Sequence, residues 1–129
     1  FLTDKVITDS DLKNFMAWRG VSGSDDIGWA ALGLVAAYRF TKNPVFLDQE
    51  YKWNGARGSK QLYAEIYEDF YDFKHGGIFW DTNRSYKSTI SNSLWVIWSA
   101  EMYEATGDKK YLKEALKVSD WMVNAGHLI

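Results

Sequence analysis

Two adjacent carboxylates, Asp25 and Asp26, open the longest apolar stretch of the 129-residue chain. No further charged residue follows until Arg39, and apolar residues cover nearly every side of the predicted helix. A helix that is apolar all round is buried on several sides, so we expect this one inside a helical assembly. A carboxylate pair at its entrance suits glycosyl transfer, with one group ionised and its neighbour protonated. Such a mixed state is reasonable because like charges close together raise the pKa of one of them.

The same pair also suits a purely structural role. The positive end of a helix dipole favours acids in the first turn by about 0.3–1 kcal/mol. Ser24 or Asp25 is predicted as the N-cap, because a short side-chain oxygen there accepts backbone N–H groups of the first turn. Neighbouring side chains inside a helix point about 100° apart, but an N-cap residue is not yet helical, so there the two carboxylates would converge on one ligand. Spacing alone leaves both interpretations open.

The composition excludes several classes of protein. The 15 basic and 17 acidic residues leave a net charge of −2, with no basic run of the kind that binds nucleic acid. No uncharged apolar stretch reaches the roughly 18 residues of a membrane span. There is no cysteine, and His75 and His127 stand alone, so no metal site or cofactor is predicted. Among 7 Trp, 8 Tyr and 7 Phe, we expect Trp95 and Trp98 in the core and Trp80, in a loop, to stack on a sugar.

Hydrophobic periodicity predicts an all-α chain of helices joined by short loops. Residues 76–88 interrupt the pattern and are predicted as a small loop or β-hairpin. Asp69 and Asp72 are interpreted as part of a solvated helix face. Short connections favour antiparallel helical hairpins. The helices are expected at residues 10–19, Asp26 to Thr41, from Pro44 onwards, Lys60 to about Phe73, Thr89 or Ser91 to Thr106, and Lys109 to Asn124.

A repeat with a displacement of 65 positions relates two of these hairpins. Repeats of roughly this size indicate stacked or ring-arranged helix pairs. The same displacement maps Asp26 onto Ser91, so the starts of both helices are expected on one rim, with Ser91 and Asn92 near the carboxylates. The repeated residues are Tyr38, Thr41, Asn43, Phe46 and Leu47, which reappear as Tyr103, Thr106, Asp108, Tyr111 and Leu112.

Four sequence blocks in a fixed order carry a family resemblance. They are Asp25-Asp26-Ile27-Gly28-Trp29 with the following helix and its Tyr38–Asn43 hairpin, Gly76-Gly77-Ile78-Phe79-Trp80-Asp81, Lys87-Ser88-Thr89-Ile90-Ser91-Asn92-Ser93-Leu94, and Tyr103-Glu104-Ala105-Thr106-Gly107-Asp108 with Tyr111-Leu112. Together they resemble glycoside hydrolase family 76, the α-1,6-mannanases of bacteria and fungi. The resemblance implies part of an (α/α)6 barrel, retaining hydrolysis of α-1,6-mannosidic bonds in α-mannan, no cofactor, and a secreted or cell-surface location.

The resemblance also implies roles for individual residues. Asp25 would be the nucleophile and Asp26 the general acid/base, since a retaining pair of carboxyl groups lies about 5 Å apart. The repeat and the resemblance together place the candidate substrate-binding residues on the cleft side. Asp81 has an alternative role in ending its turn. The substrate-binding candidates are Trp80, Asp81, Thr89, Ser91 and Asn92.

Residues 1–129 are expected to form a single partial toroid of about two hairpins and a short N-terminal helix. Six hairpins of this size would need about 360–390 residues, so we expect either a segment of a longer protein or a truncated relative. A complete chain with open apolar faces would self-associate. Three alternatives to a mannan hydrolase stay open: a cell-wall mannan transglycosylase, a non-catalytic mannan-binding or helical interaction module, and a structural repeat without a sugar ligand.

Overall fold

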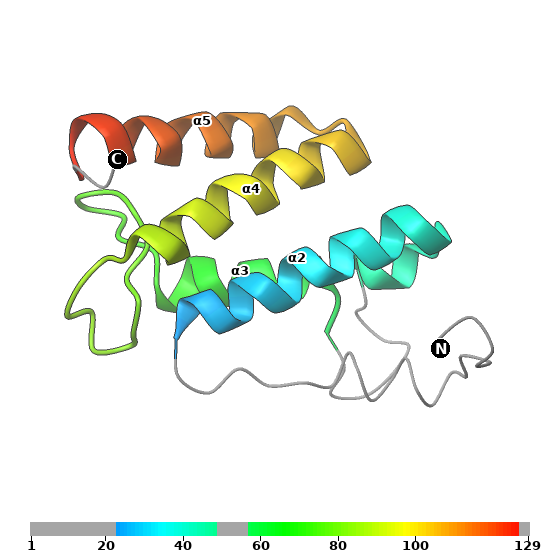
Figure 1. Ribbon diagram of the computed structural model, residues 1–129, viewed down its shortest axis with the longest axis horizontal. Coiled ribbons are helices and arrows are strands. Elements are labelled where there is room, and N and C mark those ends of the chain that lie inside the picture. The colour runs from blue at the N-terminus through cyan, green and yellow to red at the C-terminus, as the bar shows by residue number, and fades with distance from the viewer. Residues whose placement is uncertain (1–22, 49–56, 127–129) are drawn as a thin grey trace.

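The computed structural model describes residues 23–48 and 57–126, whose helices pack as neighbouring antiparallel hairpins (Figure 1). Contacts join α2 to α3 and α4, and α4 to α5. The all-α prediction is confirmed, while the helix predicted at residues 10–19 lies outside the described residues. The elements are α2 (Ser24–Thr41), the 3-10 helix η2 (Pro44–Phe46), α3 (Ser59–Asp69), α4 (Thr89–Thr106) and α5 (Lys109–Asn124).

Helices α2 and α4 repeat one another at the predicted displacement of 65 positions. Each has 18 residues, and each ends in a residue with left-handed backbone, Lys42 (φ 60°) and Gly107 (φ 74°). Asn43 and Asp108 follow, and the side chain of each accepts the backbone N–H two residues further on. Figure 1 shows α2 and α4 running in the same direction, so their starts lie at the same end. The predicted common rim is therefore present.

Aromatic rings and a buried serine hold α2, α3 and α4 together. Tyr63 of α3 stacks on Trp95 and Trp98 of α4, with ring centroids 4.1 and 3.8 Å apart. Both tryptophans are 2% exposed, which confirms their predicted place in the core. Trp98 Nε1 donates to the Ser59 hydroxyl at 2.7 Å, and that hydroxyl donates to the Ala31 carbonyl of α2 at 2.6 Å. One hydroxyl thus connects all three helices.

The α2–α4 contact is close because Gly28 has no side chain. A Cβ at Gly28 would lie 3.2 Å from Leu94 Cβ, tighter than ordinary van der Waals contact. The glycine of the first sequence block therefore lets the two helices approach near their starts.

Two predicted helices differ from the structure. The segment after Asn43 forms only the three-residue η2 before a turn at Leu47, so the helix predicted from Pro44 is wrong over the described residues. Helix α3 begins one residue early and ends at Asp69, short of the predicted Phe73. It ends there because the chain turns back, and Tyr71 pairs with Ile78 in an isolated antiparallel bridge.

Residues 70–88 form a folded loop. Of the two predicted alternatives, a small loop or a β-hairpin, the structure therefore has the loop. The β-type pairing found in the loop, within the part of the chain that the structure describes, is the isolated Tyr71–Ile78 bridge. Gly76 and Gly77 have φ values of 88° and 82°, a region that favours glycine. A Cβ at Gly76, Gly77 or Gly126 would lie within 2.7 Å of the Trp121 ring. These three glycines form a slot for the Trp121 indole.

A nearly buried ion pair anchors the same loop. Lys87 Nζ donates to Asp72 Oδ2 at 2.7 Å and to the Gly76 carbonyl at 2.6 Å. The ammonium also lies over the rings of Phe79 and Trp121, 4.8 and 5.1 Å from their centroids. Lys87 therefore joins the two ends of the loop.

The interpretation of Asp72 as part of a solvated helix face is wrong, although Asp69 is exposed. Asp72 is 7% exposed and lies beyond the end of α3. Burial alone would raise the pKa of Asp72. The hydrogen bonds from Lys87 and from the backbone N–H groups of His75 and Lys74 outweigh that effect and hold the pKa well below its usual range.

Replacing Asp72 by Asn is expected to lower the free energy of unfolding at pH 7 by on the order of 3 kcal/mol, because Lys87 loses its charged partner. A carboxyl group whose pKa is lowered by folding stabilises the protein above its unfolded-state pKa of about 4 and loses that effect as the pH falls through the folded-state pKa. The gap between parent and Asp72→Asn should therefore shrink in urea unfolding below about pH 4. Asp69→Asn is the matched control, with about 0.5 kcal/mol or less expected. A gap independent of pH would contradict this account.

Candidate active site

The loop segment 78–80 lies between the starts of α2 and α4. Asn92 in the first turn of α4 accepts the Ile78 N–H at 2.8 Å, and its Nδ2 donates to the Ile78 carbonyl at 3.0 Å. On the α2 side, the Ser24 N–H donates to the Trp80 carbonyl at 2.8 Å. Both helix starts are therefore hydrogen-bonded to the same short segment.

Two serine hydroxyls join the helix starts directly. The Ser24 hydroxyl donates to the Phe79 carbonyl at 2.7 Å and hydrogen-bonds the Ser91 hydroxyl at 2.8 Å. Ser88 is the N-cap of α4, and its side chain accepts the Ser91 N–H at 3.1 Å. Ser91 and Asn92 thus lie at the rim with the acidic pair, as the repeat predicts.

The prediction of Ser24 or Asp25 as the N-cap is wrong. Gly23 occupies that position with extended backbone (φ −141°, ψ 159°), and Ser24 is the first helical residue. The Ser24 hydroxyl does not cap the first turn because Phe79 and Ser91 engage it. Asp25 and Asp26 are both helical, so their side chains leave the axis about 100° apart instead of converging at a cap.

Asp25 and the Trp80 indole both lie beside Gly23. A Cβ at Gly23 would lie 2.5 Å from Asp25 Oδ1 and 3.0 Å from Trp80 Cε2, so only glycine leaves room for both. Asp25 Oδ1 is buried and has no hydrogen-bond partner among the described residues. A buried, unpaired carboxylate oxygen is costly and often has a catalytic explanation. Gly23 was missed by the sequence interpretation, because only the packing of Trp80 reveals it.

The two acids differ in environment. One oxygen of Asp25 is buried against the loop, whereas Asp26 is exposed. Carboxyl groups in contrasting environments can take different roles, one as nucleophile and one in proton transfer. The first turn of α2 therefore carries two acids in unequal environments, and their part in glycosyl transfer stays a prediction.

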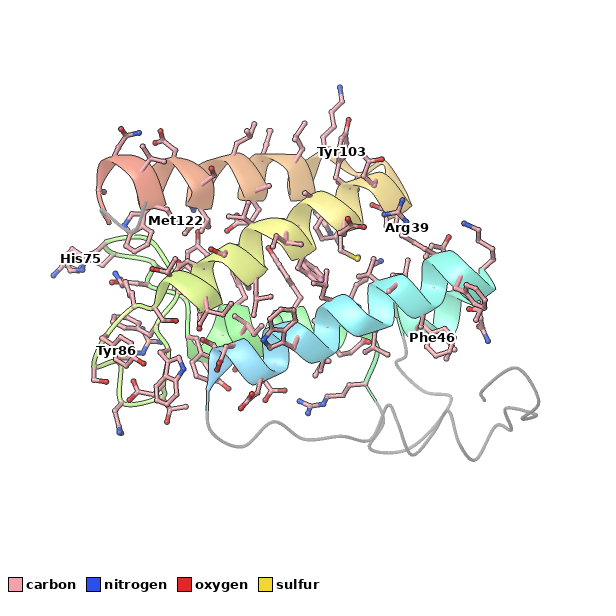
Figure 2. All side chains as sticks on the ribbon, in the orientation of Figure 1. Arg39, Phe46, His75, Tyr86, Tyr103 and Met122 are labelled. Atoms are coloured by element: carbon pink, nitrogen blue, oxygen red, sulfur yellow. The ribbon has the colours of Figure 1, made fainter. Side chains whose placement is uncertain are left out.

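Trp80 is half-buried and has one aromatic neighbour in the loop. Its ring stacks on Tyr86 with centroids 5.5 Å apart and an angle of 23° between the ring planes. The backbone N–H of Trp80 donates to the Tyr86 carbonyl at 2.8 Å. Figure 2 shows Tyr86 and His75 at the loop end of the molecule, opposite Arg39, Phe46 and Tyr103. Stacking of a sugar on Trp80 stays a prediction.

Asp81 and Thr89 complete the candidate residues. Asp81 accepts the Ser85 N–H at 3.1 Å and the Ser85 hydroxyl at 2.8 Å, and these hydrogen bonds lower the pKa of Asp81. They fit its alternative role in the turn. Thr89 is the exposed first residue of α4. Direct sugar contact by Asp81, Thr89, Ser91 or Asn92 stays a prediction.

The described ranges, 23–48 and 57–126, hold no group of three or more His, Asp or Glu residues placed to bind a metal ion. None of the helices described there is both long enough and apolar enough to cross a bilayer.

Sequence comparisons identify similar proteins. A family model described as glycosyl hydrolase family 76 matches residues 4–128. The chain is 28% identical over 120 residues to the mannan endo-1,6-alpha-mannosidase DFG5 of Saccharomyces cerevisiae, covering 84% of this chain and 24% of that protein. The chain thus spans about a quarter of the length of this relative.

A structural comparison supports the fold. A solved structure of a D-mannose isomerase superposes with a TM-score of 0.62 at 18% identity, covering 92% of this chain and 30% of that chain. The likeness shows the fold alone. The arrangement of helical hairpins is that of part of an (α/α) barrel, as predicted.

Replacing Gly23 by Ala is expected to destabilise the protein by about 1–3 kcal/mol, because the new methyl group overlaps Asp25 Oδ1 and the Trp80 ring. Gly33→Ala is the matched control. Nothing lies within 4 Å of a Cβ at Gly33 in the middle of α2, so this change should stabilise by about 0.5–1 kcal/mol. Urea unfolding of both variants measures the difference. Equal effects of the two substitutions would show that Gly23 is not packed as described.

Proposed function

The chain belongs to glycosyl hydrolase family 76, and on that premise we propose that it is a retaining glycoside hydrolase, or a segment of one, that cleaves α-1,6-mannosidic bonds in mannan. The observation that carries the proposal is the acidic pair Asp25-Asp26 at the start of α2. One oxygen of Asp25 is buried beside Gly23, near the Trp80 indole, and Asp26 is exposed at the same rim. A polymeric mannan substrate also supports a secreted or cell-surface location. Residues 1–129 are then one partial toroid.

In the proposed mechanism, Asp25 is the nucleophile and Asp26 the general acid/base. A carboxylate oxygen of Asp25 attacks the anomeric carbon while Asp26 gives its proton to the glycosidic oxygen. The bond between the anomeric carbon and that oxygen breaks, and the leaving sugar departs as an alcohol. Asp26 then takes a proton from water, whose oxygen attacks the same carbon and releases Asp25. Two inversions retain the α configuration. Trp80, Asp81 and Thr89 are proposed to contact the sugars.

Hydrolysis of an α-1,6-mannan by the chain is expected to be lost when either acid is replaced by Asn. Asp26→Asn should lower kcat by on the order of 10²–10⁴-fold, as for the loss of a general acid/base, and Asp25→Asn at least as much. Reducing-sugar release gives the rate, and NMR of the first product gives its anomeric configuration. The exposed Asp69→Asn serves as control and should keep the parent rate. A β product, or unchanged rates in both variants, would refute the retaining pair.

Two other functions are distinguished by the same assay. A transglycosylase would use the same covalent intermediate and pass the mannosyl group to a sugar acceptor, so longer products would form when an oligosaccharide is added. A mannan-binding module would bind mannan without turnover, and its binding would survive Asp25→Asn and Asp26→Asn.

We also propose that, where residues 1–129 are the complete chain, a second copy covers an apolar surface between α2 and α4. A groove of about 560 Å³ lies there, and its residues include Phe40, 91% exposed, and Ile97, 46% exposed. Contiguous exposed apolar patches of this kind mark association surfaces. The groove is lined by Leu32, Ala36, Arg39, Phe40, Ile97 and Glu101.

Sedimentation velocity over a range of protein concentrations is expected to show reversible association of the parent chain. The double substitution Phe40→Ser and Ile97→Ser should weaken it, because the apolar area available to the second copy falls. Leu116→Ser on α5 is the control, since this leucine is also exposed but lies outside the groove. A parent that stays monomeric at all concentrations would contradict the proposal.

A further inference from the structure

Asn92 is fully buried and engaged with the backbone. It is 0% exposed, and its Oδ1 accepts the Ile78 N–H. Its Nδ2 donates to the carbonyls of Ile78 and Ser88, at 3.0 and 2.8 Å. Both N–H groups of the amide and its oxygen are therefore used inside the protein. In this arrangement the amide fixes the loop to the start of α4.

The fixed segment continues directly to the start of α2. The two residues after Ile78 are Phe79 and Trp80, whose carbonyls accept the hydroxyl and the N–H of Ser24 at 2.7 and 2.8 Å. The Ser24–Ser91 hydroxyl bond ties this contact back to α4. The segment 78–80 thus has hydrogen bonds to both helices within three residues.

The segment ends against the candidate nucleophile. The Trp80 indole and Asp25 Oδ1 both lie beside Gly23, close enough that a Cβ there would overlap them. Because Asp25 Oδ1 has no hydrogen bond among the described residues, no directional interaction orients it. The space beside Gly23, which this oxygen shares with the Trp80 indole, therefore limits its position.

We infer that Asn92 is a positioning residue for glycosyl transfer, which together with Ser24 and Ser91 sets the orientation of Asp25 through the segment 78–80. The inference rests on the proposed role of Asp25 as nucleophile. Reaction rates depend steeply on the placement of reacting groups, and a displacement of about 1 Å costs on the order of 100-fold. On this inference Asn92, which is 0% exposed, acts on the reaction through Asp25, in place of the direct sugar contact predicted from the sequence.

The test combines kinetics with 19F NMR of chain labelled with 5-fluorotryptophan. Asn92→Ala is expected to lower kcat on α-1,6-mannan by on the order of 100-fold. KM should stay within about threefold, because substrate binding is not what Asn92 supports. The Trp80 resonance, assigned with Trp80→Phe, should shift, whereas the resonance of Trp98, in the core, should not. Asn124→Ala is the control, since Asn124 is an exposed asparagine on α5 bonded to Asp120.

Ser24 provides a second, milder variant in case Asn92→Ala does not fold. Ser24→Ala should shift the Trp80 resonance and lower kcat, and Ser24→Thr, which keeps the hydroxyl, should restore both in part. Folded variants with an unchanged Trp80 resonance and unchanged kcat would overturn the inference, as would a KM increase that accounts for the whole loss. A parent chain without turnover would refute the proposed function instead, and the Trp80 resonance alone would then decide the positioning role.

Discussion

The rest of the structure depends on the hydrogen bonds of the segment 78–80. Its backbone groups are paired with Asn92 on one helix and Ser24 on the other. An unpaired buried backbone group costs about 1–3 kcal/mol, so the loop and the two helix starts satisfy one another only when all three are in place. The rim that carries Asp25 and Asp26 is consequently one unit, and the environment of the acids is decided by a loop more than 50 positions away in sequence.

Much of this arrangement could be predicted because it depends on local chemistry. The ends of α2 and α4 follow from residues next to them in sequence. Gly107 ends α4 with left-handed backbone, and the side chains of Asn43 and Asp108 cap the helices that come next. The displacement of 65 positions then places Ser91 and Asn92 at the rim without any assumption about function. That placement is confirmed by the Ser24–Ser91 hydrogen bond.

The errors share a different cause, which is a partner distant in sequence. Ser24 has the right side chain for an N-cap, but Phe79 and Ser91 engage its hydroxyl. Asp72 has the sequence context of a solvated helix, but it is paired in the loop with Lys87, 15 positions later in the sequence. Residue type and periodicity describe only what a side chain can do locally. Which of several good partners it meets depends on the packing of the whole chain.

The slot around Trp121 has a consequence for related sequences. Two of its walls, Gly76 and Gly77, come from the loop, and the third, Gly126, follows the end of α5, so the indole connects the site loop to the last helix. A side chain at any of these three positions would overlap the ring. Over evolutionary time the three glycines and the tryptophan are therefore expected to change together. In an alignment, the joint presence of the three glycines and the tryptophan would mark chains whose loop has this conformation. A substitution at only one of these positions would mark a chain whose loop has a different conformation.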